Sequence, residues 1–167
     1  MDAYLQRLQD AIASVTADMT VEDLQRHPQG KWSTAEVLEH LYLTYTGTVK
    51  GFERCLQAGK PLARTPLLKD RVKTFVVTRL GHLPEGRKAP DRTQPRGMPP
   101  EEVKREIGPR ISAMDEVIAQ CEARFGKRTR VVDHPILGPL TASQWRKFHW
   151  VHGRHHIKQI QKLRAAK

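Results

Sequence analysis

Apolar residues recur every three or four positions over long stretches of this chain, which is the spacing of the buried face of an α-helix. In the first stretch Tyr4, Leu8, Ile12, Val15 and Met19 share one face. The pattern predicts four long helices and a short fifth, over residues 4–19, 33–58, 101–125 and 141–163, and over 67–80. Val131-Val132 is the one β-like pair noticed, and it is too short to predict a sheet.

Local signals support these boundaries. Ser33 and Glu36 have the spacing of a capping box, in which each side chain accepts from the other residue's backbone amide, and Thr141 and Gln144 repeat it. The intervening segment 59–100 is basic and rich in proline, and Gly81 to Gly97 reads as a loop. It has too few apolar residues for its own core. We therefore expect one all-α domain over 1–167, a four-helix bundle with a short extra helix in a long crossover.

Composition narrows the functional classes. The 167 residues include 29 Lys+Arg and 18 Asp+Glu, a formal net charge of +11. The cations are spread singly and no nucleic-acid-binding motif is present, so a nucleic-acid partner is not favoured. No apolar run is long enough to span a membrane, and the start lacks a secretory signal. Cys55 and Cys121 fall on apolar helix faces, as expected of reduced core cysteines in a cytoplasmic protein.

Histidine is the unusual residue type: of eight, four lie between positions 149 and 156. His152 and His156 are one helical turn apart at the centre of the buried arc of the last predicted helix, so their imidazoles point the same way. Either a divalent metal or hydrogen bonds could satisfy them. A metal would need a third ligand from another helix, and His40 is the candidate, because small residues follow on its face (Thr44, Gly47 and Gly51). An exposed His40 with incidental small neighbours is the alternative.

Three segments together resemble the DinB/YfiT-like superfamily of metal-binding four-helix bundles. They are Trp32-Ser33 with Glu36–Leu41, His134–Thr141, and Trp150–Ile157. The resemblance extends over nearly the whole chain, and the combination of segments is more specific than any one of them. It implies an up-down-down-up helix order and a three-histidine site formed by His40, His152 and His156.

The same resemblance implies a metal-dependent enzyme, because characterised relatives include thiol S-transferases that use low-molecular-weight thiols. Imidazole ligands suit zinc and nickel equally, so either ion is expected. The reaction could be thiol transfer or hydrolysis of a small molecule, and no catalytic residue can be assigned. A non-catalytic metal-binding or interaction bundle and a basic nucleic-acid-binding protein remain as alternatives.

Other residues receive supporting roles. We expect His134 to fix its loop by a hydrogen bond and Gln159 to orient an imidazole or a bound water. Glu36 and Glu39, the acids near His40, could equally cap the helix or face solvent. Trp150 and Ile157 lie opposite the histidines, and we expect either the 67–80 segment or a second subunit of a homodimer to cover them.

Overall fold

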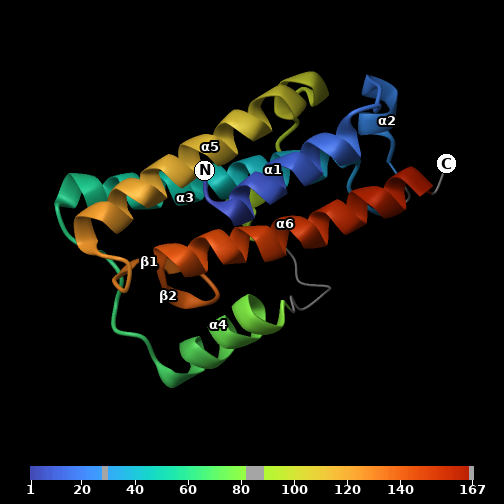
Figure 1. Ribbon diagram of the computed structural model, residues 1–167. Coiled ribbons are helices and arrows are strands. Elements are labelled where there is room, and N and C mark those ends of the chain that lie inside the picture. The colour runs from blue at the N-terminus through green and yellow to red at the C-terminus, as the bar shows by residue number, and fades with distance from the viewer. Residues whose placement is uncertain (28–29, 82–88, 166–167) are drawn as a thin grey trace.

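The computed structural model describes residues 1–27, 30–81 and 89–165, and it is mostly helical (Figure 1). Its elements in chain order are α1 (Ala3–Thr16), α2 (Val21–Gln25), α3 (Thr34–Ala58), α4 (Leu68–Leu80), the 3-10 helix η1 (Asp91–Thr93), α5 (Pro100–Phe125), β1 (Arg130–His134), β2 (Gly138–Thr141) and α6 (Ala142–Ala165). The mostly helical class expected from the periodicity is confirmed. Two segments that the sequence predicts to be non-helical extend partly outside the described residues. They are residues 27–30, where His-Pro-Gln-Gly interrupts the helical pattern, and the loop at 81–97.

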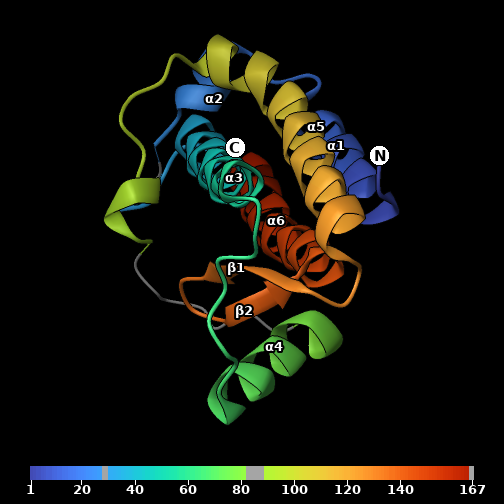
Figure 2. The ribbon, with the colours of Figure 1, turned by 90° about the vertical axis from the view of Figure 1, so that its left-hand side faces the viewer.

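The four long helices lie side by side and enclose the core (Figures 1 and 2). Helix α3 packs against α5, and α1 packs against α6. Large apolar side chains from all four are fully buried between them, among them Leu8, Leu41, Phe52, Ile111 and Ile160. None of the described helices is both long enough and apolar enough to cross a membrane.

The first predicted helix is divided in two. Helix α1 ends at Thr16, and α2 begins after Thr20, whose hydroxyl accepts from the Asp23 amide while the Asp23 carboxylate accepts from the Thr20 amide. This third capping box is a start signal that the apolar pattern concealed, because the buried Met19 continues the helical spacing across the break. The boxes expected at Ser33–Glu36 and Thr141–Gln144 are both present.

The expectation of no sheet was wrong. Strands β1 and β2 pair antiparallel, with Val132 opposite Leu140 and His134 opposite Gly138. Contacts from distant parts of the chain hold β1: the Val131 carbonyl accepts from the Leu62 and Ala63 amides, and the Val132 carbonyl accepts from the Trp145 indole. Its strands have only five and four residues, so they gave little signal in the sequence. Hydrogen bonds to residues distant in the chain stabilise them.

The crossover contains the expected short helix, since α4 matches the predicted 67–80 segment almost residue for residue. It lies against α6 and β2 on the outside of the long helices (Figure 2). Within the predicted loop, residues 91–93 form η1, which contacts α3. This contact brings the crossover back to the helix that carries His40.

Ile157 is covered by α1, which was not among the covers expected for it. Ile157 is 7% exposed in the single chain and lines a hollow together with Ala11, Ser14 and Val15 of α1. One turn earlier, Gly153 gives Leu8 of α1 the space that a side chain would fill. Helix α1 therefore covers this face, and neither α4 nor a second subunit is needed there. Trp150 is half-buried against the same core.

Candidate metal centre

Three histidine side chains from two helices converge at one point. His40 extends from α3, and His152 and His156 extend from α6. The Nε2 atom of His152 lies 3.4 Å from Nε2 of His40 and 3.1 Å from Nε2 of His156. Potential ligand atoms of all three residues lie within 4.8 Å of one another, and no other histidine, cysteine or acid of the described residues joins the group. The structure thus brings together the three residues singled out in the sequence.

The outer ring nitrogens fix which tautomers are present. His40 Nδ1 lies 2.8 Å from the Thr93 carbonyl oxygen, which can only accept, so Nδ1 carries the proton. His156 Nδ1 likewise donates to Gln159 Oε1 at 3.0 Å. In both neutral rings the Nε2 lone pair is left facing the centre of the group, as in histidines whose second nitrogen is held for metal binding. The orienting role expected of Gln159 agrees with this geometry.

Burial keeps these rings neutral. The pKa of His156 is lowered to about 3, first by burial and then by the neighbouring His40. Burial also lowers the pKa of His40, opposed in part by the Thr93 hydrogen bond. For His152 burial lowers the pKa well below its ordinary value, and the nearby histidines lower it further. Metal ligation requires the deprotonated ring, so the site is prepared for a cation near neutral pH.

The sequence matches a protein family over residues 2–163, and that family is described as "Protein of unknown function (DUF1569)". The chain belongs to this family. A search of the curated proteins and a search of the solved structures found no match.

Glu39 holds the loop that contacts His40, a structural role that the sequence did not reveal. Its carboxylate is buried and accepts from three consecutive backbone amides, those of Arg96, Gly97 and Met98, at 2.8 to 3.1 Å. These amides follow η1 directly, so Glu39 ties the end of the crossover to α3. The same crossover supplies the Thr93 carbonyl that orients His40. The signal in the sequence was a carboxylate adjacent to His40, but its partners lie more than fifty residues away.

Replacing Glu39 by glutamine is expected to weaken metal binding about tenfold, because the loosened loop no longer holds the Thr93 carbonyl against His40. Isothermal titration of chelator-treated protein with zinc measures the change. Glu36→Gln is the matched control, since Glu36 caps α3 at Ser33 and holds none of these amides. Equal losses in the two variants would contradict a positioning role for Glu39.

Several aromatic rings pack next to the three histidines. Phe148 stacks on His152 with 5.4 Å between ring centroids, and Trp32 lies 5.3 Å from His40. His134 packs on Phe148, and its Nδ1 accepts from the Ile136 and Leu137 amides, which is the loop-fixing role expected of it. Aromatic rings therefore pack against His40 and His152 on one side of the site.

His149 is a fourth buried histidine near the site, on the same helix as His152 and His156. It is fully enclosed, and its Nε2 lies 3.1 Å from the Thr48 hydroxyl. The small residues of α3 admit β1 as well as α6, since Val132 approaches the backbone of Gly51 closely. At Gly51 the close neighbour of α3 is therefore a strand.

The pKa values of His134 and His149 are lowered to about 3, mainly by burial, so acid is expected to destabilise the metal-free protein. The unfolded chain binds more protons than the folded one between the unfolded value of about 6.5 and the folded value. The free energy of unfolding therefore decreases as the pH is lowered through that window, by up to about 1.4 kcal/mol per pH unit for each group. Urea unfolding in the presence of a chelator measures this slope.

In this measurement His149→Gln should give a shallower slope, because the glutamine does not titrate. A slope that is the same in the His149 variant and the parent would refute the assignment to His149.

Proposed function

We propose that this chain binds one divalent metal ion through His40, His152 and His156, and that it is a metal-dependent enzyme acting on a small molecule. The supporting observation is the convergence of three Nε2 atoms, two of which lack a proton because Nδ1 carries it. Of the three rings, only His152 could carry its proton on Nε2. That single proton cannot form a good hydrogen bond with Nε2 of His40 and Nε2 of His156 at the same time. A cation at the centre would satisfy all three lone pairs.

The donor set fits such an ion. Ligand nitrogens around tetrahedral zinc at 2.0–2.1 Å are separated by about 3.3 Å. Two Nε2 separations, 3.1 and 3.4 Å, agree with this value, and the candidate ligand atoms of all three residues lie within 4.8 Å of one another. If Nε2 of His152 bound the metal, the proton of this ring would be on Nδ1, which is buried and has no hydrogen-bond partner among the residues described. Zinc and nickel remain the expected ions.

When bound by three neutral imidazoles, a divalent ion retains its full charge and offers an open position as a Lewis acid for a thiolate or water. The protein's own contribution is orientation. Thr93 and Gln159 hold two of the rings, and Phe148 and Trp32 pack against them. This arrangement keeps the ligands preorganised and limits solvent access from the packed side.

Thiol transfer is favoured over hydrolysis as the reaction. A hydrolase of this type would use a carboxylate as a general base. The two acids nearest His40 in sequence are both engaged, Glu36 in the cap of α3 and Glu39 with three loop amides. A low-molecular-weight thiol needs no such base once its thiolate is stabilised by the cation.

We also propose that the four long helices form the up-down-down-up bundle of the DinB-like superfamily. The packing of α3 on α5 and of α1 on α6, together with the long crossover between α3 and α5, supports this arrangement. The two cysteines are free and buried, which is compatible with the expected cytoplasmic location.

The test begins with elemental analysis of protein purified without added metal, for which we expect one divalent ion per chain. Glutathione and cysteine are then offered with 1-chloro-2,4-dinitrobenzene. In this reaction the thiolate sulfur forms a bond to the ring carbon, and the carbon–chlorine bond breaks to release chloride. We expect turnover that chelation removes and added metal restores.

A cobalt-substituted sample separates binding from catalysis. A thiol that ligates cobalt produces a sulfur-to-metal charge-transfer band, whereas a closed structural site does not. Stoichiometric metal with neither this band nor turnover would overturn the thiol-transferase proposal and favour the non-catalytic metal-binding alternative.

A further inference from the structure

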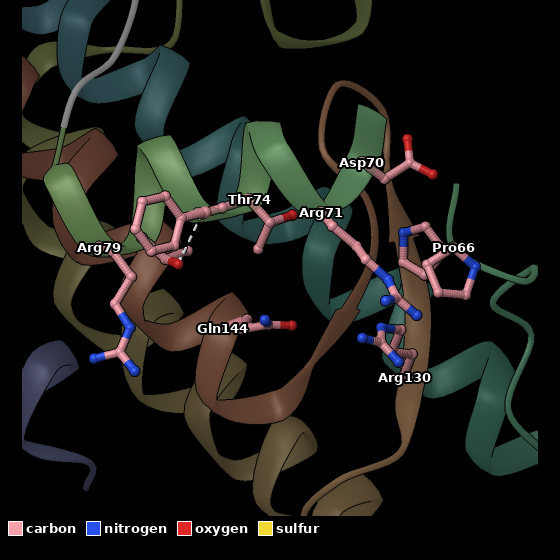
Figure 3. A pocket seen from close by; sticks show the side chains of 10 residues that line it. Pro66, Asp70, Arg71, Thr74, Arg79, Arg130 and Gln144 are labelled. Carbon is pink, nitrogen blue, oxygen red and sulfur yellow. Dashed lines mark hydrogen bonds between the residues drawn. The ribbon is translucent and has the colours of Figure 1, made fainter. Parts of the chain in front are cut away.

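A cavity distinct from the histidine group lies between α4, the β-hairpin and the start of α6 (Figure 3). Its volume is about 220 Å³, smaller than a typical drug-sized pocket. Three arginines line it, Arg71 and Arg79 from α4 and Arg130 from β1. In Figure 3 the side chains of Arg71 and Arg130 extend toward the same end of the cavity, and Arg79 lies at the other end.

None of these three guanidinium groups has a carboxylate partner among the residues that the structure describes. The one acid in the lining, Asp70, is already paired: its Oδ2 accepts from Arg64 at 2.7 Å and from the Leu67 amide at 2.9 Å. Like charges collected around a cavity repel one another, and a bound anion would relieve that repulsion.

The uncharged lining adds one further donor. Gln144 Oε1 accepts from the Thr141 amide in the cap of α6, so the amino group of Gln144 is left to donate. The hydroxyls of Thr74 and Thr78 already donate to carbonyl oxygens. Donation to a ligand would therefore come from the arginines and Gln144.

We propose that this cavity binds a phosphate group, independently of the histidine site. Guanidinium groups match the geometry of phosphate oxygens with paired hydrogen bonds, and the two unpaired cations at one end of the cavity, Arg71 and Arg130, suit a dianion better than a carboxylate. The cavity volume accommodates a phosphate and a small organic part. Phe75 lines the same cavity and is 56% exposed, so its ring offers an apolar surface to that part.

The experiment uses chelator-treated full-length protein, so that a metal at the histidine site cannot hold phosphate. Inorganic phosphate and phenyl phosphate are titrated at constant ionic strength, and binding is followed by ³¹P NMR. We expect saturable binding of both, and tighter binding of phenyl phosphate. Arg130→Gln should weaken phosphate binding by about tenfold, the loss expected of one charge-assisted hydrogen bond.

Arg128→Gln is the matched control, because it removes the same charge two residues away from an exposed side chain that does not line the cavity. Arg71→Gln and Lys69→Gln form a second pair on α4. Equal weakening of phosphate binding within each pair would overturn the proposal. So would a parent protein that binds neither phosphate compound saturably and does not bind vesicles containing phosphatidic acid.

A lipid arm identifies the source of the phosphate group. Flotation is compared for phosphatidylcholine vesicles with and without phosphatidic acid, whose headgroup is a phosphate monoester. Binding that depends on phosphatidic acid and on Arg130 but not Arg128 indicates a lipid headgroup. Binding of free phenyl phosphate without flotation indicates a soluble phosphate ester.

Discussion

Protein carrying His152→Ala is expected to contain almost no metal, whereas the parent is expected to hold one divalent ion per chain. His152 is the central member of the group, since its Nε2 lies within 3.4 Å of the Nε2 atoms of both His40 and His156. Its removal leaves two nitrogens, which are too few to retain a structural or catalytic divalent ion at neutral pH. Elemental analysis after purification without added metal gives the metal content directly.

His155→Ala is the control for this experiment. His155 is the next histidine on α6 and its ring lies 5.1 Å from that of His156, yet it does not belong to the three-nitrogen group. This variant should retain the full metal content. Metal retained by the His152 variant, or lost equally from both, would refute the assigned ligand set.

Replacing Arg146 by alanine is expected to lower the free energy of unfolding by about 3–5 kcal/mol, because it leaves buried acids without their cation. Arg146 donates from Nε to Asp115 at 2.8 Å and from Nη1 to Glu122 at 2.7 Å, and it joins α6 to α5. Asp115 is itself buried and also accepts from the Asp2 amide, so the same acid ties down the start of α1. Urea unfolding of the metal-free protein measures the loss.

Arg105→Ala provides the comparison. Its ion pair with Glu106 is on the surface of α5, where exposed pairs contribute about 0–1 kcal/mol. A difference between the two variants of less than about 1 kcal/mol would show that the buried network contributes little.

Much of the helical architecture could be predicted from local pattern. The apolar spacing predicted α3, α4, α5 and α6 within a few residues, and the Ser33 and Thr141 caps marked two of their starts. Helix periodicity and capping depend on residues three or four apart, so they can be read along the chain. The same reasoning predicted that His152 and His156 face one way, because one helix carries both.

Features that depend on distant partners were harder to predict. The hairpin of β1 and β2 is stabilised by contacts with residues 62, 63 and 145, and no local signal indicates them. The cover over Ile157 was assigned to the wrong partner, because periodicity shows that a face is apolar but not which helix packs on it. Helix α1 fills that position through Leu8 and Gly153.

The candidate site was likewise predicted only in part from the sequence. The sequence by itself determined the mostly helical class, the shared face of the two α6 histidines and His40 as the candidate third residue. Only the tertiary structure decided that His40 is buried beside them, that the Thr93 carbonyl orients it, and that three arginines line a separate cavity. Periodicity fixes the direction of a side chain on its own helix, whereas the contacts between helices, loops and strands are fixed by packing over the whole chain.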